Sequence, residues 1–169
     1  MRVIYFFIVF TILLLNSSCS VLDKTVQVYD SAKEFVFPSG EKLKWEKVSI
    51  GVGEKANKNF PISVDIAMIF EEGLVPRIEK LTSNDWFKSK KQILNTFPTG
   101  LAVKSWELAP GDSLQVTSTF FGKERIFAVV AFADYFTDGD HRARIDKLEG
   151  LILLEFGNES FSAYAVNRN

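Results

Sequence analysis

Cysteine and histidine are nearly absent from the chain, which has 169 residues but only Cys19 and His141 of these two types. A single cysteine excludes an intrachain disulfide, and one residue of each type is too few for a Cys/His zinc cluster. The sequence also lacks the glycine-rich patterns that hold nucleotide phosphates and the paired histidines of zinc proteases. These absences exclude the most readily recognised classes of metal and nucleotide chemistry.

An excess of charge of either sign is also missing, because the formal net charge is −1. This balance gives no reason to expect nucleic-acid binding, which needs a basic surface. Apolar residues are plentiful at 47%, with 16 phenylalanines but only 2 methionines. The composition therefore suits one domain with a core rich in aromatic and β-branched residues.

The first apolar stretch, residues 3–15, is interrupted only by Thr11 and follows the single positive charge of Arg2. It is too short for a membrane-spanning helix, which needs about 20 apolar residues. Its length, the preceding arginine and the small residues Ser17 and Ser18 after it are typical of a secretory signal peptide. We therefore predict a signal peptide over residues 1–18.

Cys19 comes directly after this segment, in the sequence Asn16-Ser17-Ser18-Cys19. The pattern resembles a bacterial lipobox, although Asn16 stands where leucine is usual and Leu15 lies one position earlier. We expect Cys19 to carry a diacylglycerol and an N-acyl chain, since several acyl chains anchor a protein far more firmly than one. The next residue is Ser20, and a residue other than aspartate at this position resembles the signal for sorting a lipoprotein to the outer membrane. An ordinary cleaved signal with an incidental cysteine is the alternative.

Residues 19–40 read as a lipidated N-terminus and tether, and residues 41–169 as the folded domain. In this domain, short segments rich in β-branched and aromatic residues alternate with turn signals. The strands predicted from these segments cover residues 43–52, 62–70, 101–108, 113–121, 125–135, 142–145, 151–156 and 161–166. In the first of them, the apolar alternation changes register between Trp45 and Val48.

Residues 73–97 break the alternation and predict a helical insertion. Ser83 or Asn84 is the expected cap, Asp85 lies near the predicted helix start, and Pro98 ends the helix. Trp86, Lys90, Ile93 and Phe97 share one helical face. Alternating strands need a second sheet to cover their apolar faces. The predicted fold is therefore an all-β, two-sheet sandwich with a helical insertion between its second and third strands.

Four sequence features, taken in order after the signal, resemble the TssJ (SciN) lipoproteins of bacterial type VI secretion systems. They are the strand PISVDIAMIF, the helical aromatic pair in DWF, the strand and turn ELAPGDSLQV, and the segment FAVVAFADYFTDGDHRARI. The chain departs from the family pattern at Tyr135 and Phe136, where polar residues are common. The resemblance implies a transthyretin-like β-sandwich and a structural role without enzymatic activity, metal or cofactor.

The resemblance also implies a place and partners. Such lipoproteins are anchored in the inner leaflet of the outer membrane and face the periplasm. They bind the periplasmic C-terminal domain of the inner-membrane subunit TssM, which together with TssL forms the membrane complex. The family's main partner contact is the loop between the first two sandwich strands. In this chain that loop comprises Gly53, Glu54, Lys55, Ala56, Asn57, Lys58, Asn59 and Phe60.

The composition of this loop allows two interpretations. Its polar and charged side chains suit hydrogen bonds and rim charge pairs, which guide association more than they supply affinity. Phe60 suits an apolar anchor, because aromatic side chains dominate interface hot spots. The simpler interpretation is a solvated loop between two strands.

Two other groups of residues permit a functional interpretation. Asp134, Asp138 and Asp140 could supply oxygen ligands to calcium, but Gly139 between two aspartates favours an ordinary turn. His141 could act in a Ser-His-Asp arrangement, but the sequence lacks the GxSxG nucleophile elbow of such hydrolases.

The alternatives to the type VI function are a periplasmic binding module, such as a secretin pilot protein or a carbohydrate binder, and an outer-membrane-anchored hydrolase.

Overall fold

The computed structural model describes residues 40–122 and 124–166 of the chain. The predicted signal peptide, Cys19 and all of the predicted tether except Gly40 lie outside the described residues. The folded domain begins at Gly40.

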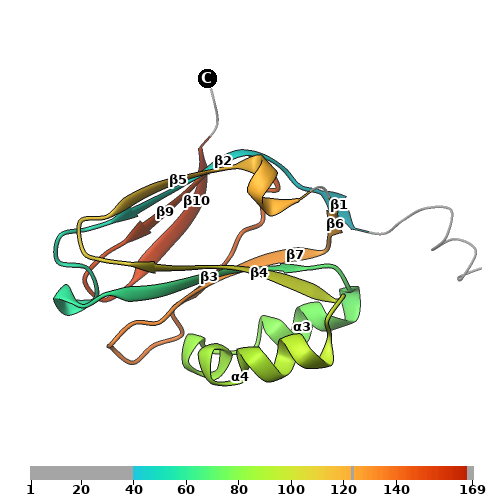
Figure 1. Cartoon of the computed structure of the whole chain (residues 1–169), viewed down its shortest axis with the longest axis horizontal. Coiled ribbons are helices and arrows are strands. Elements are labelled where there is room, and N and C mark those ends of the chain that lie inside the picture. Colours follow the sequence, from blue (N-terminus) through green and yellow to red (C-terminus); the bar gives the residue numbers. More distant parts are fainter. Residues whose placement is uncertain (1–39, 123, 167–169) are drawn as a thin grey trace, which may run out of the picture. The chain divides into compact units, whose positions relative to one another are not determined.

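Two four-stranded sheets make up the domain (Figure 1). The first sheet contains β10 (Phe161–Val166), β9 (Glu149–Phe156), β2 (Lys44–Val52) and β5 (Ser113–Thr117), in that order. The second contains β4 (Leu101–Leu108), β3 (Ile62–Ile69), β7 (Ala128–Ala133) and β8 (Arg142–Arg144). Neighbouring strands are antiparallel except β2 and β9, which are parallel. The predicted sandwich is confirmed.

A short third sheet lies where the described chain begins. It pairs β1 (Glu41–Lys42) with β6 (Arg125–Ile126), and the Arg125 Nε donates a hydrogen bond to the Gly40 carbonyl over 3.1 Å. Strand β2 then has a register irregularity between Trp45 and Lys47. This bulge explains why the apolar alternation of the sequence changes phase there.

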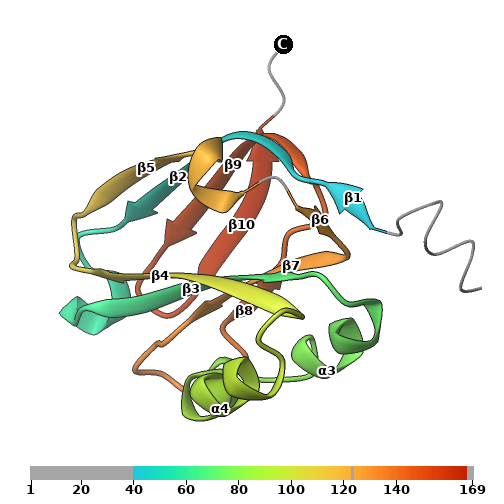
Figure 2. The same cartoon turned by 45° about the vertical axis from the view of Figure 1, so that its right-hand side comes forward.

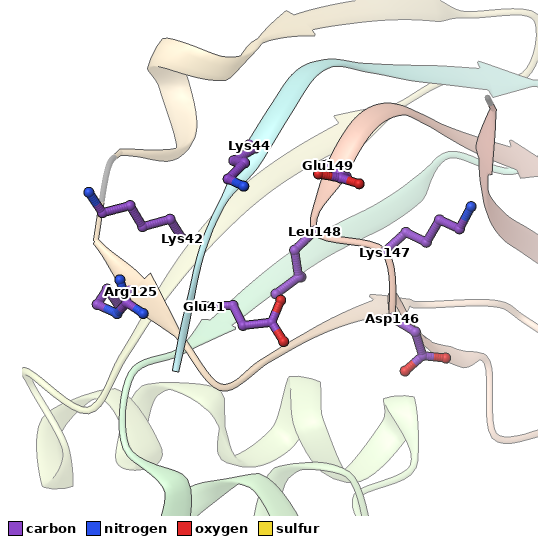
Figure 3. Close-up of a pocket in the computed structure, with 8 residues that line it drawn as sticks. All are labelled: Glu41, Lys42, Lys44, Arg125, Asp146, Lys147, Leu148 and Glu149. Carbon is purple, nitrogen blue, oxygen red and sulfur yellow. The ribbon is translucent and has the colours of Figure 1, made fainter. Parts of the chain in front are cut away.

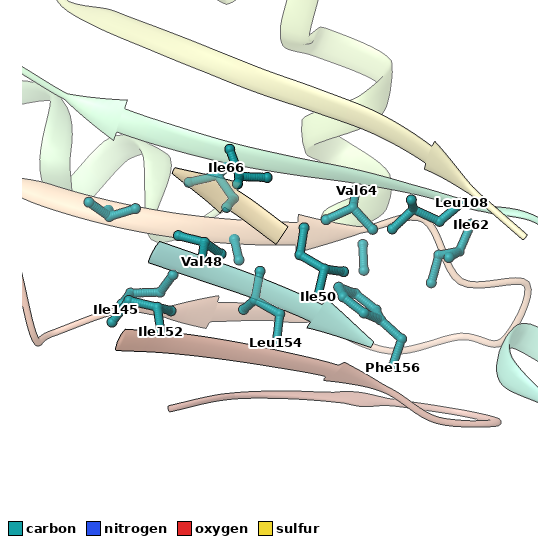
Figure 4. Close-up of a cluster of buried hydrophobic side chains, with 14 of the residues drawn as sticks. Val48, Ile50, Ile62, Val64, Ile66, Leu108, Ile145, Ile152, Leu154 and Phe156 are labelled. Carbon is teal, nitrogen blue, oxygen red and sulfur yellow. The ribbon is translucent and has the colours of Figure 1, made fainter. Parts of the chain in front are cut away.

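The main core lies between the two four-stranded sheets (Figure 4). Strand β3 contributes alternate side chains to it, namely Ile62, Val64, Ile66 and Met68. Strands β2 and β9 contribute the opposing layer, and the Trp45 ring meets the Phe121 ring edge-on, with 5.2 Å between centroids. This arrangement follows from the period of two in a strand, which sends alternate side chains to one face.

A second core lies on the opposite face of the β3 sheet, under the helical insertion. The insertion consists of η3 (Glu72–Leu74), α3 (Val75–Ile78) and α4 (Ser83–Thr96). Trp86 of α4 stacks on Phe132 of β7, with ring centroids 4.6 Å apart. The alternate face of β3 is therefore also buried and holds Ala67 and Ile69. The predicted insertion is confirmed, and Figure 2 shows both helices lying against this sheet.

One polar group in this second core fixes α4 to the sheet. The Asp65 carboxylate, only 1% exposed, accepts a hydrogen bond from Trp86 Nε1 over 2.7 Å and pairs with Lys90 Nζ over 2.8 Å. Because the lysine follows the tryptophan by four residues, both side chains reach the same carboxylate from one face of the helix. The carboxylate thus holds the helix in register with β3.

The start of α4 differs from the prediction that Ser83 or Asn84 caps it. The cap is Thr82, whose backbone is extended and whose hydroxyl accepts a hydrogen bond from the Asp85 amide over 3.2 Å. Ser83 instead turns inward: its hydroxyl contacts the His141 carbonyl and accepts a hydrogen bond from the Ala133 amide. Thr82 was not among the predicted caps, and contacts outside the helix take Ser83 away from the capping position.

Two predicted strands are shorter than their apolar patterns suggest. Strand β5 ends at Thr117 and the chain enters the short helix η4 (Ser118–Phe121). The turn points Phe121 into the core and leaves Phe120 45% exposed, whereas the alternation of Leu114 and Val116, continued along a strand, predicts that Phe120 is buried. The predicted strand 125–135 is divided into β6 and β7, of which β7 pairs on both sides, as expected of a central strand.

Among the described residues, no helix has the length and apolarity needed to cross a membrane.

Candidate functional site

Four loops meet at one end of the sandwich, on the left in Figure 1, while Gly40 and the β1–β6 pair lie at the other end. The loops are 53–61 between β2 and β3, 109–112 between β4 and β5, 134–141 between β7 and β8, and 157–160 between β9 and β10. The sheet registers place them together, because Val52 lies opposite Phe156 and Ile62 lies opposite Leu108. The predicted partner-binding loop is therefore part of a larger loop cluster.

Loop 53–61 has a defined backbone conformation. It contains the short helix η2 (Ala56–Asn59), in which Asn57, Lys58 and Asn59 all have positive φ, at 46°, 54° and 72°. Non-glycine residues rarely adopt this left-handed conformation, although asparagine tolerates it better than most. A run of three such residues requires contacts elsewhere that hold the loop in place.

Asn57 provides those contacts. Its side chain is 2% exposed; Oδ1 accepts a hydrogen bond from the Phe136 amide over 2.6 Å, and Nδ2 donates one to the Pro61 carbonyl over 2.8 Å. Its own amide donates to the Gly157 carbonyl over 3.2 Å. One residue therefore connects three of the four loops. Both polar atoms of its side-chain amide therefore have a hydrogen-bond partner inside the protein.

Two aromatic side chains project beside this connection. Phe60 is 52% exposed and Phe136 is 72% exposed, and their rings stack with centroids 5.1 Å apart and an interplanar angle of 13°. They come from different loops, 53–61 and 134–141. The Asn57 side chain bonds to the Phe136 amide and to the carbonyl of Pro61, the residue after Phe60, so it sets the relative position of the two rings.

The charges around the rings differ from side to side. Glu54, Lys55 and Lys58 are exposed on the Phe60 loop. On the other side, partial burial and the nearby Glu107 carboxylate raise the pKa of Asp134 above its ordinary value. Burial is the larger cause of this raised pKa, and the Glu107 carboxylate adds a repulsion between like charges.

The rest of loop 134–141 is tied to the body of the domain. The Tyr135 hydroxyl donates to the Ser160 carbonyl over 2.6 Å and approaches the Gly157 carbonyl at 3.2 Å, and burial raises its pKa. The His141 ring packs on Tyr135, with centroids 4.6 Å apart, and its Nε2 lies 2.8 Å from the Thr137 carbonyl. His141 is therefore part of the loop's internal support.

The calcium alternative for the aspartates finds no support in this geometry. Asp140 pairs with Arg142 over 3.4 Å, and within residues 40–122 and 124–166 no three His, Cys, Asp or Glu side chains are placed to hold a metal ion. Arg142 also donates a hydrogen bond to the Leu81 carbonyl over 2.8 Å, which joins the start of β8 to the helical insertion.

A recess at the opposite end of the domain carries charges of both signs (Figure 3). Its charged lining residues are Glu41, Lys42, Lys44, Arg125, Asp146, Lys147 and Glu149. Four of these residues are basic and three are acidic, so no one sign of ligand charge is strongly favoured. The loop end of the sandwich is therefore the better candidate site.

The structure changes the predicted site in two ways. Ala56 and Asn57 were expected to contact a partner, but they are 1% and 2% exposed and support the loop from within. Phe136 was missed, although the sequence departs from the family pattern at this position. Gly53, Glu54, Lys55, Lys58, Asn59 and Phe60 are exposed, as a contact role requires.

Comparison with known proteins finds likeness in structure rather than in sequence. No protein-family model and no curated protein sequence matches the chain. The T6SS lipoprotein TssJ1 from Pseudomonas aeruginosa superposes with a TM-score of 0.53 at 11% identity, covering 78% of this chain and 100% of that one.

Two further solved structures agree. Lip from Serratia marcescens, a membrane-bound component of its type VI secretion system, gives a TM-score of 0.50 at 11% identity, covering 77% of this chain and 100% of Lip. A chain from a type VI membrane complex gives 0.53 at 16% identity, covering 75% and 99%. The domain therefore has the fold of the TssJ-type lipoproteins of type VI secretion systems.

Proposed function

We propose that this protein is the lipoprotein subunit of a type VI secretion membrane complex, held at the outer membrane and facing the periplasm. It binds the periplasmic C-terminal domain of the TssM subunit, and through it joins TssL, using the loop end of the sandwich. The role is structural rather than catalytic. The observation that carries the proposal is the TssJ-type fold, matched over 78% of the chain and the whole of the neighbouring structure.

The positions of Gly40 and the loop cluster at opposite ends of the domain support this function. The described chain starts at Gly40, beside β6, and the four-loop cluster lies at the far end of the sheets (Figure 1). A chain anchored through residues that precede Gly40 would present the loop cluster away from its point of attachment. Such an orientation suits a protein that links one membrane to a partner anchored in another.

Membrane attachment is proposed through lipidated Cys19. Metabolic labelling with palmitate should mark the wild-type chain and leave the Cys19→Ala variant unmarked, and the variant should fractionate away from the outer membrane. One acyl chain holds a protein only marginally, whereas a triacylated cysteine holds it firmly. Equal labelling of the two chains would refute the anchor.

Partner binding is tested with the full lipidated chain. Affinity capture from envelope extracts should recover TssM and TssL, whereas recovery of a secretin or a glycan would favour the alternative functions. In a direct assay, the charge reversals Lys55→Glu and Lys58→Glu together should slow association with the purified TssM domain, because rim charges act mainly on the association rate. The matched control reverses Lys88 and Lys91, two exposed lysines of α4.

A further inference from the structure

The stacked pair Phe60–Phe136 combines side chains from two loops, of which the sequence predicted only the first as a contact. Of the exposed large apolar side chains in the described segments, these two are the most exposed, and they stack on each other. Exposed Phe120, by contrast, lies against Trp106 and under the Lys104 ammonium. Two adjacent exposed aromatic rings on rigid loops are an unusual feature for a surface that only meets water.

We propose, on the basis of the proposed function, that Phe60 and Phe136 form one composite anchor that enters an apolar pocket of the partner, and that Asn57 is the residue that positions both rings. Both side chains are more than half exposed, so the partner surface that fits them is concave and apolar. The docking surface is therefore built from loops 53–61 and 134–141 together.

The geometry of the two loops reduces the conformational freedom that the anchor loses when it binds. Asn57 bonds to the backbone of both loops, and its left-handed conformation and those of the next two residues are held in the folded domain. Binding then does not need to order the loops, and the rings are placed before the partner arrives. Preorganisation of this kind raises affinity because less conformational freedom is lost on association.

The acidic groups near the start of the Phe136 loop set the charge that we expect at the rim of the partner's pocket. Asp134 and Glu107 are both exposed and acidic, and the Asp134 amide donates to the Ser63 carbonyl while Ser63 Oγ donates to Glu107 over 2.6 Å. The two carboxylates thus flank Ser63 at the same edge. A basic group of the partner would pair with these exposed carboxylates, so we expect the pocket to carry lysine or arginine on this side.

The anchor is tested by measuring the affinity of the full chain for the purified TssM periplasmic domain. Phe136→Ser and Phe60→Ser should each weaken binding by about 10-fold or more, as expected for aromatic hot spots. The double variant should lose less than the product of the two single effects, because the rings act as one unit. Phe120→Ser is the matched control and should change affinity by less than about twofold.

Asn57→Gly tests the positioning role, since glycine keeps the left-handed backbone but removes both amide hydrogen bonds. It should weaken binding in the wild-type chain and cause no further loss in the Phe60→Ser/Phe136→Ser background. A merely structural role would weaken binding equally in both backgrounds, and that result would overturn the role of Asn57.

The two proposals fail in different ways. If Phe136→Ser binds as tightly as wild type while the Lys55→Glu/Lys58→Glu variant is impaired, the composite anchor is wrong and the proposed function stands. If the wild-type chain does not bind the TssM domain at all, the proposed function fails and the anchor fails with it.

Discussion

The ion pair between Asp65 and Lys90 should respond unequally to the loss of either partner. Asp65 is almost completely buried, whereas the Lys90 side chain keeps 28% of its exposure. In Asp65→Asn, the unpaired ammonium can turn toward water, and the amide oxygen can still accept the Trp86 indole hydrogen bond. In Lys90→Met, the charged Asp65 carboxylate stays buried. Of its two partners, only the Trp86 indole then remains.

The magnitudes follow from the two environments. Replacing a charge-assisted hydrogen bond by a neutral one costs about 1 kcal/mol of unfolding free energy. Leaving an uncompensated buried charge costs about 3 to 5 kcal/mol, and the retained indole hydrogen bond favours the lower end. We therefore expect Lys90→Met to be less stable than Asp65→Asn by about 2 kcal/mol, and the double variant to be more stable than Lys90→Met alone.

Urea unfolding followed by circular dichroism measures this difference. The control is Lys91→Met, because Lys91 lies on the same helix and is exposed; its effect should stay within about 0.5 kcal/mol. The reasoning is refuted if Asp65→Asn is the more destabilising change, or if adding Asp65→Asn to Lys90→Met lowers stability further.

Three further predictions use other parts of the domain. Burial raises the pKa of Tyr135, so the fold should lose stability as the pH rises above about 10; urea midpoints of Tyr135→Phe should fall less steeply there, and parallel curves would contradict this. Thr82→Ala should cost about 1 kcal/mol of unfolding free energy by removing the helix cap, and an unchanged urea midpoint would exclude that role. Glu107→Gln should lower the pKa of Asp134 in an NMR titration while burial keeps it above the ordinary value; a titration unaffected by the substitution would remove the proposed repulsion.

Local sequence pattern predicted most of the sandwich because its strands obey the period of two. The predicted ranges 101–108 and 161–166 coincide with β4 and β10, and the phase change near Trp45 corresponds to the bulge in β2. The failures occur where distant contacts decide the local conformation. Phe120 left the buried face because the chain turns into η4 after Thr117, a change that alternation cannot register.

The candidate site was only partly predictable for the same reason. The loop between β2 and β3 could be located, since both flanking strands have clear patterns. The sequence could not indicate that Asn57 faces inward, because its partners are the backbone groups of Pro61, Phe136 and Gly157. Phe136 differed from the family pattern, but its pairing with Phe60 depends on how the two loops meet in space.

The parallel pairing of β2 with β9 determines the order in which this domain can fold. Lys44 lies opposite Glu149, and the Trp45 indole donates to the Lys147 carbonyl, 102 residues further along the chain. Contacts between such distant segments slow folding, because a long loop must close before they form. A chain supplied from its N-terminus has one edge of β2 unpaired until residues 149–156 arrive. Until then Val48 and Ile50 lack Ile152 and Leu154, their neighbours in the same sheet. Strand β2 is thus made early but is among the last strands to have both neighbours in place. Until then the unfinished domain exposes apolar surface that can bind a chaperone or aggregate.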